Sequence, residues 1–207
     1  MNINIGESIG FSWLKHIKNC IICQNNWKLY EHPDQKTEQA IDKLILDIGK
    51  KGLESKLWGN SRASKILKQT EIDVVGIDAK NKCYLLELAC HIGSLNYGGK
   101  AETKDRIIKK FVKMSIVAEY IFKCNRAEII FASPIVSEEI KNNTCNNLKK
   151  IKNYFKKCQF TFIGNKDFTD KITDPLIDNA APSIAETEPF MRSLLFLAKS
   201  SKLKLKK

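Results

Sequence analysis

The stretch EIDVVGIDAKNKCYLLELACHIGSLNYGGK, residues 71–100, decides how the chain folds. It contains two runs rich in β-branched and aliphatic residues, 72–78 and 82–90, joined by the polar turn DAKNK. This pattern predicts a β-hairpin. Side chains alternate between the two faces of a strand, so a hairpin centred on Lys80 places Asp73 and Glu87 opposite each other on one face. The sequence therefore predicts two carboxylates that meet across adjacent strands.

Opposed carboxylates at these two positions need a partner. They repel each other across a strand pair, and burying either charge alone is costly. A hard divalent cation such as Mg²⁺ or Mn²⁺ takes oxygen ligands and offsets both effects. The alternative is that one carboxylate points to solvent or meets a lysine. We interpret Asp73 and Glu87 as ligands of a metal site.

The composition predicts a globular protein with an anionic partner. The chain has 207 residues, enough for a single domain, with 43% hydrophobic and 28% charged residues. Its net charge of +12 favours nucleic acid as the partner, with a membrane surface second. Apolar runs are far shorter than the roughly 20 residues that span a bilayer, and the N-terminus lacks a signal pattern. We expect DNA as a partner and no membrane contact.

The seven cysteines are odd in number and stand mostly in apolar contexts. Reduced thiols are typical of such usage, so we expect a cytoplasmic protein. Cys20 and Cys23 form one CxxC pair, but zinc sites normally need a second pair. Two thiols packed on an apolar face are the favoured interpretation, and structural zinc is the alternative.

The spacing of apolar residues predicts the remaining elements. A helix is expected from about residue 9 to Asn25 or Asn26, and a second from Thr37 to Gly49 or Gly52. In the second helix Glu38 falls on the inward face, or else complements the helix dipole. Residues 53–58, together with 62–67, are expected to supply one strand before the hairpin, and further strands are expected at 127–132 and 159–163. Helices are expected at 102–122, 137–157 and 189–199, and a loop at 167–182.

From Thr37 the predicted order is helix, three strands, helix, strand, helix, strand. With an inward glutamate on the first helix, an aspartate on the second strand and a glutamate on the third, this order resembles the PD-(D/E)XK nuclease superfamily. The resemblance implies an α/β, restriction-endonuclease-like αβββαβ core, with a central mixed sheet flanked by helices. It covers residues 37–163 of a single domain, with an N-terminal helical extension (1–36) and a C-terminal loop, helix and basic tail (164–207).

The resemblance also implies roles for particular residues. In the superfamily, the motif Asp…Glu-x-Lys binds one or two Mg²⁺ ions, and its lysine activates or orients the attacking water. Asp73 and Glu87 match the two acidic positions, and Glu38 matches the helical glutamate. The sequence departs from the motif where Ala89 stands at the lysine position. Because some members carry this lysine elsewhere, we assign it to Lys100, with His91 as a second candidate.

Nucleic-acid contacts are expected around the following loop and helix. The segment 93–99 is glycine-rich, which lets a phosphate approach the backbone, and Tyr97 can stack on a base or sugar. Basic residues of helices 102–122 and 137–157 are expected on solvated faces, where they bind phosphates without reading sequence. The candidates on the first of these helices are Lys104, Arg106, Lys109 and Lys110.

These features support three hypotheses. The first is a Mg²⁺-dependent DNA endonuclease of restriction, defence or repair type. The second is a nucleic-acid-binding module of the same fold without activity. The third is a subunit of a defence complex whose targeting comes from a partner, and a homodimer is a further possibility. Signatures of other chemistries, including GxxxxGK[ST], HExxH and GxSxG, are missing from the sequence.

Overall fold

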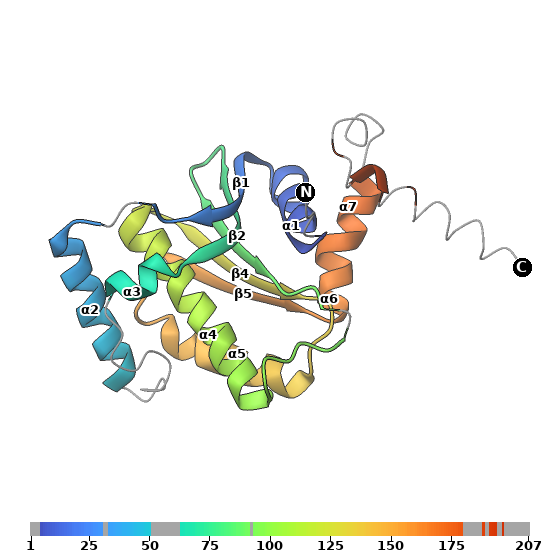
Figure 1. Ribbon diagram of the computed structural model, residues 1–207. Coiled ribbons are helices and arrows are strands. Elements are labelled where there is room, and N and C mark those ends of the chain that lie inside the picture. The colour runs from blue at the N-terminus through green and yellow to red at the C-terminus, as the bar shows by residue number, and fades with distance from the viewer. Residues whose placement is uncertain are drawn as a thin grey trace, which may run out of the picture.

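Five strands form one mixed sheet in the order β1-β2-β3-β4-β5 (Figure 1). The computed structural model describes residues 5–30, 33–50, 63–91, 93–179, 188, 191–193 and 196. Strands β1 and β2 and strands β2 and β3 are antiparallel, whereas β3, β4 and β5 are parallel. The strands are β1 (Cys20–Lys28), β2 (Glu71–Asp78), β3 (Cys83–Leu88), β4 (Ala127–Ser133) and β5 (Cys158–Gly164).

Helices cover both faces of this sheet, which confirms the predicted α/β fold with its flanked mixed sheet (Figure 1). One buried cluster joins α2, α3, α4 and α5 to the sheet, and a second joins α1 and the helical segment 166–179 to the opposite face. The helices are α1 (Ile5–His16), α2 (Gln35–Lys50), α3 (Ala63–Lys68), α4 (Lys100–Ile116) with the π-helical turn η1 (Val117–Ile121), α5 (Glu138–Ile151), α6 (Lys166–Phe168), η2 (Thr169–Thr173) and α7 (Asp174–Asn179).

The β2–β3 hairpin has the register that the sequence predicts. Val74 pairs with Leu86 and Ile77 pairs with Cys83, so the hairpin is symmetric about residue 80. One step beyond the Val74–Leu86 pair, the same register sets Asp73 opposite Glu87. Leu86 and Val74 belong to the cluster under α1, so the alternate residues of both strands face α4.

The first strand of the sheet comes from a segment whose apolar spacing predicts a helix. The expected helix to Asn25 or Asn26 is wrong, because α1 ends at His16 and β1 begins at Cys20. Asn19 separates them with a φ of 54°, a left-handed conformation that asparagine tolerates better than most residues. Two consecutive β-branched residues, Ile21 and Ile22, then favour a strand. The sheet therefore begins before residue 37.

Two further expectations need correction. Residues 63–68 form the helix α3 and not part of a strand, and residues 166–179 are helical where a loop was expected. The strand expected at 53–58 lies outside the described residues, as does most of the helix expected at 189–199. The helix expected from 137 starts as predicted, because the Ser137 hydroxyl accepts a hydrogen bond from the Ile140 amide at 3.3 Å, but it ends at Ile151.

A disulfide joins Cys83 on β3 to Cys124, just beyond η1. The expectation of reduced thiols throughout is therefore wrong for this pair. Both residues are buried in the cluster between the sheet and α4. The bond ties the start of β3 to the end of the helix that packs over it. Cys20, Cys23, Cys90, Cys145 and Cys158 are free thiols.

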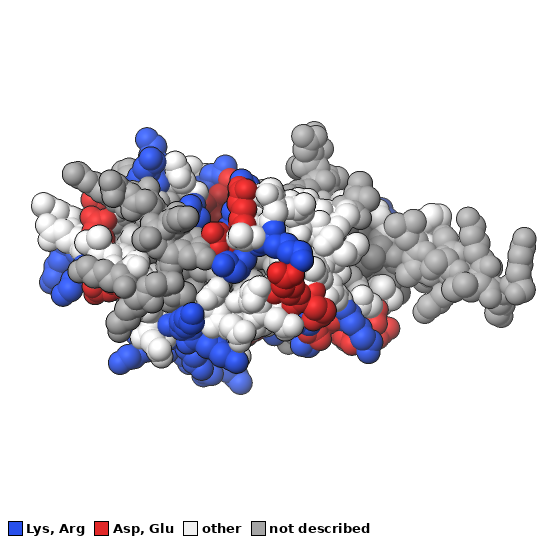
Figure 2. Space-filling view, turned by 90° about the horizontal axis from the view of Figure 1, so that it is seen from below, with Lys and Arg blue, Asp and Glu red and all other residues white. Residues whose placement is uncertain are grey.

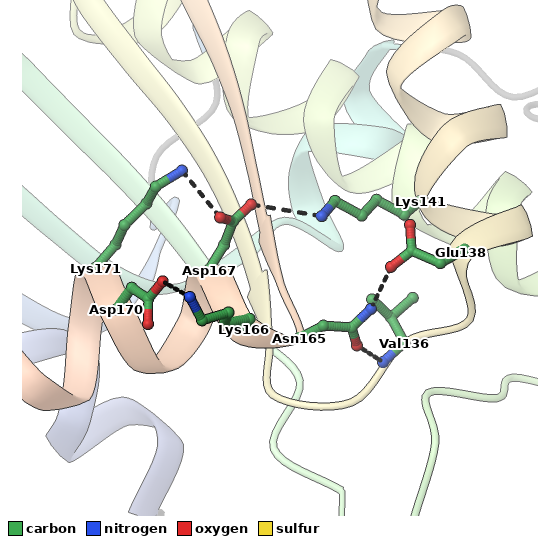
Figure 3. A network of polar contacts seen from close by, with 8 residues as sticks. All are labelled: Val136, Glu138, Lys141, Asn165, Lys166, Asp167, Asp170 and Lys171. Atoms are coloured by element: carbon green, nitrogen blue, oxygen red, sulfur yellow. Dashed lines mark hydrogen bonds and ion pairs between the residues drawn. The ribbon is translucent and has the colours of Figure 1, made fainter.

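A polar network fixes the loops at the carboxyl ends of β4 and β5 (Figure 3). Asn165, with a φ of 57° and a ψ of −130°, accepts a hydrogen bond from the Val136 amide through Oδ1 at 2.8 Å. Its Nδ2 donates to Glu138 Oε1, also at 2.8 Å. Ion pairs between Asp167 and both Lys141 and Lys171 lie beside it. These contacts offset the cost of the unusual backbone conformation and hold the β4–α5 loop in place.

That loop in turn supports the segment that follows β3. The Leu95 amide donates to the Ile135 carbonyl at 2.9 Å, and Leu95 is buried. The Ser133 hydroxyl donates to the Ala89 carbonyl at 3.0 Å. The carboxyl ends of the three parallel strands are thus joined to one another beside the position of Glu87.

Candidate active site

Asp73 and Glu87 lie where the β2–β3 hairpin meets α4. The Glu87 side chain is 4% exposed, and Asp73 Oδ2 accepts a hydrogen bond from the Leu88 amide at 2.7 Å. Burial raises the pKa of Asp73. Burial, reinforced by the charge of Asp73, raises the pKa of Glu87 to about 7 despite the attraction of Lys110. The hairpin therefore holds two mutually repelling carboxylates in a site that disfavours their charged forms.

The cation that meets this pair is Lys110. Its ammonium makes an ion pair and a hydrogen bond with Glu87 Oε2. Burial lowers the pKa of Lys110, but the charge of Glu87, its hydrogen bond and the charge of Asp73 outweigh this effect and raise the pKa overall. The expectation that Lys110 belongs to the solvated face of its helix is wrong. The sequence held a signal, since Lys110 stands three residues after Ile107 and four before Met114, both of which are buried.

The charge of a third carboxylate acts on Asp73 from the opposite layer. The negative charge of Glu7, on α1, is among the causes that raise the pKa of Asp73, after burial. Helix α1 comes this close because of Gly10, where a Cβ would lie only 2.5 Å from a methyl group of Leu88. Glu7 Oε2 also accepts a hydrogen bond from Asn26 Nδ2 at 2.5 Å. The signal for Glu7 was its spacing of three residues from Gly10, which is buried.

Two residues assigned from the sequence lie elsewhere. Lys100, expected to replace the motif lysine, points to Glu139 on α5 and makes an ion pair with it, with its side chain 67% exposed. Glu38 lies half-buried in the first turn of α2, which stands at one edge of the molecule (Figure 1). The structure thus brings Lys110 to Glu87 where Lys100 was expected, and the charge of Glu7 to Asp73 where that of Glu38 was expected.

Of the residues expected to contact nucleic acid, Tyr97 and Arg106 lie together. His91, the second candidate for the missing lysine, is exposed and meets the Tyr97 ring edge-on, with 5.7 Å between ring centroids. The Arg106 guanidinium lies over the Tyr97 ring at 5.5 Å from its centroid and pairs with Glu102 at 2.6 Å. Lys104 pairs with Asp105 at 3.5 Å, and Lys109 is half-buried.

Acidic partners therefore interrupt the positive surface. On the face seen from below, acidic side chains stand between the lysines and arginines, and a group of basic side chains gathers at one edge (Figure 2). α4 and α5 form the lower part of the molecule in the view of Figure 1. DNA binding by Tyr97, Lys104, Arg106 and Lys109 therefore stays a prediction.

The acidic pair fits a divalent cation of the Mg²⁺ type. Within the described ranges, no group of three or more His, Cys, Asp or Glu side chains is arranged to hold a metal. Structural zinc at Cys20 and Cys23, the alternative interpretation of that pair, therefore gains no support. Mg²⁺, however, is commonly bound through one or two carboxylates, with water and substrate phosphate completing its shell. Asp73 and Glu87 would be two such carboxylates. Burial raises the pKa of each, so a bound cation would offset the cost of keeping both groups charged.

Comparison with known proteins gives one distant similarity. No protein-family model matches the chain, and no curated protein sequence matches it. Among solved structures it is similar to the crystal structure of a repair endonuclease from Pyrococcus abyssi, at 14% identity over 65% of this chain and 48% of that one, with a TM-score of 0.27. The chain thus spans about half the length of that endonuclease. No helix in the described part of the chain is long and apolar enough to cross a membrane.

Proposed function

We propose that this protein is a divalent-cation-dependent nuclease that hydrolyses phosphodiester bonds in DNA. The observation that carries the proposal is the buried Glu87 carboxylate, set opposite Asp73 on a rigid hairpin and contacted by Lys110. A carboxylate pair can hold a divalent cation that activates water for attack on a phosphodiester, and an adjacent ammonium group can orient that water or attract the phosphate. The net charge of +12 supports an anionic substrate.

Each residue has a distinct part in this chemistry. Asp73 and Glu87 would hold Mg²⁺ or Mn²⁺, and the Leu88 amide keeps the Asp73 carboxylate in place through its hydrogen bond. When bound, the cation would neutralise the phosphate and lower the pKa of a water molecule. Lys110 stands beside Glu87, where its ammonium can orient the attacking water and attract the phosphate. Glu7 adds negative charge on the side of α1.

Lys110 also offers an explanation for the missing motif lysine, whose position in the sequence holds Ala89. The resemblance to the PD-(D/E)XK superfamily calls for a lysine near the glutamate, and some members carry it on the helix that follows the hairpin. Lys110 stands on that helix, α4, and contacts Glu87. This contact supports Lys110 as the counterpart of the motif lysine, although it lies 23 residues beyond the glutamate in sequence.

One observation favours an inactive nucleic-acid-binding module as a second candidate. The Lys110 ammonium already supplies a positive partner to Glu87, so the structure can compensate this buried charge without a metal. In such a module the pair would be structural, and the basic surface alone would bind DNA.

Cleavage assays separate the two candidates. Wild-type protein, Asp73→Asn and Glu87→Gln are incubated with plasmid, linear duplex, single-stranded DNA and RNA in Mg²⁺, Mn²⁺ or chelator. Glu139→Gln, which alters an exposed carboxylate paired with Lys100, is the matched control. The nuclease proposal predicts cation-dependent DNA cleavage by the wild type and the control, and none by the other two. Binding without cleavage under every condition supports the inactive module, and preferential RNA cleavage overturns the choice of DNA.

A further inference from the structure

The Tyr97 ring is held in place by its neighbours, unlike a surface ring with a face free to stack on a base. Arg106 lies over one face of its ring and His91 contacts it edge-on. Its ring is packed against the buried cluster beneath α4. The surroundings thus already occupy much of the ring, which makes the hydroxyl the group left to act on a substrate.

The backbone around Tyr97 is held from both sides. Its amide donates to the Thr103 hydroxyl at 2.8 Å, and Thr103 is fully buried. The Asn96 side chain accepts hydrogen bonds from the Gly98 and Gly99 amides at 3.1 and 2.8 Å. Leu95 is anchored to the β4–α5 loop through its bond to the Ile135 carbonyl. A residue supported in this way keeps one orientation, as a group that acts in catalysis must.

The phenol lies beside the candidate active site. Arg106 and Lys110 are one helical turn apart on the same side of α4, so the residue that covers the ring is next to the one that pairs with Glu87. The charges of Lys110, Glu87 and Asp73 all act on the Tyr97 hydroxyl. Burial, the largest cause, raises its pKa above the usual value. The hydroxyl therefore keeps its proton and remains a hydrogen-bond donor across the physiological range.

We propose that the Tyr97 hydroxyl donates a hydrogen bond to a non-bridging oxygen of the scissile phosphodiester, which makes Tyr97 a catalytic residue. The inference rests on the proposed nuclease function. Negative charge on the non-bridging oxygens must be compensated as water attacks, and a fixed neutral donor does so without reorganising. Tyr97 keeps its proton throughout and forms no covalent bond.

Tyr97→Phe tests this role, because it removes one oxygen and leaves the ring against Arg106 and His91. Tyr154→Phe is the matched control, since the Tyr154 hydroxyl donates to the Asp47 carbonyl at 3.3 Å in an exposed position. Single-turnover cleavage is measured over a range of DNA concentrations in Mg²⁺. We expect Tyr97→Phe to lower the maximal rate by about 100-fold, with the half-saturating DNA concentration changed by less than about threefold. The control should cleave normally.

The outcomes separate the inference from the function on which it rests. Equal maximal rates for Tyr97→Phe and an active wild type overturn the role of the hydroxyl and leave the nuclease intact. A rise in the half-saturating DNA concentration with an unchanged maximal rate also overturns that role, because the residue would then only bind DNA. Wild type that cleaves no DNA overturns both. The thermal midpoint of Tyr97→Phe should stay within about 2 °C of wild type. Tyr97→Leu lacks both the hydroxyl and the ring, and its maximal rate should not exceed that of Tyr97→Phe.

Discussion

Lys110 on α4 makes an ion pair with Glu87 on β3, and this contact joins two surfaces that look unrelated in the sequence. Glu87 is almost fully buried, whereas a third of the Lys110 side chain remains exposed. Part of the lysine side chain therefore remains accessible to solvent, next to a carboxylate that does not.

The first prediction concerns the identity of the active-site lysine. Lys110→Ala should lower the rate of DNA cleavage by about 100-fold or more, because it removes the cation that contacts Glu87. Lys100→Ala should cleave normally, because Lys100 pairs with Glu139 on the surface. Single-turnover assays of both variants decide the assignment. A strong loss in Lys100→Ala together with normal cleavage by Lys110→Ala would return the role to Lys100.

The second prediction is a pH-dependent gain in stability for Glu87→Gln. The folded state raises the pKa of Glu87 from 4.5 to about 7, chiefly through burial. Folded protein therefore binds this proton more tightly than unfolded protein, and stability is lost as pH rises from about 4.5 to about 7. Glutamine does not titrate. In the metal-free protein, the free energy of unfolding of Glu87→Gln should therefore rise relative to that of wild type across this window, by on the order of 2 kcal/mol.

Urea unfolding at pH 5 and pH 8 measures this difference. Glu139→Gln, at an exposed site, is the control, and the difference between its stability and that of wild type should be nearly the same at the two pH values. A Glu87→Gln variant that is less stable than wild type at pH 8 would mean that the bond to Lys110 outweighs the cost of burial.

The third prediction concerns the backbone at Asn165. Asn165→Ala loses the hydrogen bonds to Val136 and Glu138 and must still adopt a positive φ, so it should be destabilised by about 2–4 kcal/mol. Asn165→Gly loses the same bonds but tolerates the conformation, and should be more stable than the alanine variant by about 1 kcal/mol. Urea unfolding of both proteins gives the comparison. Equal stabilities of the alanine and glycine variants would show that the positive φ at residue 165 costs no free energy.

The fourth prediction is a steep dependence of DNA binding on salt. The net charge of +12 implies that binding releases counterions. Affinity for a labelled duplex, measured without a divalent cation, should fall by at least about tenfold between 50 and 200 mM salt. Arg106→Gln should reduce the slope of this dependence if Arg106 exchanges Glu102 for a phosphate. Binding that does not change with salt would point to a partner other than nucleic acid.

The hairpin was predictable because two local rules determine it. Alternation fixes which residues share a face, and the length of the turn fixes which residues pair, so the positions of Asp73 and Glu87 follow from the sequence alone. The inward face of α4 followed equally from its apolar spacing, with Ile107 and Phe111 fully buried.

The remaining parts of the site depend on tertiary contacts. A lysine within an apolar stripe can turn to solvent or to a buried carboxylate, and only the position of β3 beneath α4 decides this for Lys110. The role of Glu7 depends on how closely α1 approaches Leu88, which requires Gly10. Strand β1 is an edge strand with an irregular register after Cys20, so its apolar residues lack a clean alternation that a sequence pattern could identify.

The binding of Mn²⁺ in the absence of DNA tests most directly whether Asp73 and Glu87 form a cation site. Paramagnetic resonance titrations would compare wild type, Asp73→Asn, Glu87→Gln and Glu38→Gln, with far-ultraviolet circular dichroism to verify folding. We predict one Mn²⁺ site in the wild type and in Glu38→Gln, and its loss in Asp73→Asn and in Glu87→Gln. Mn²⁺ binding that survives both of these substitutions, or a wild type that binds none, would contradict the assignment of a metal site to this pair.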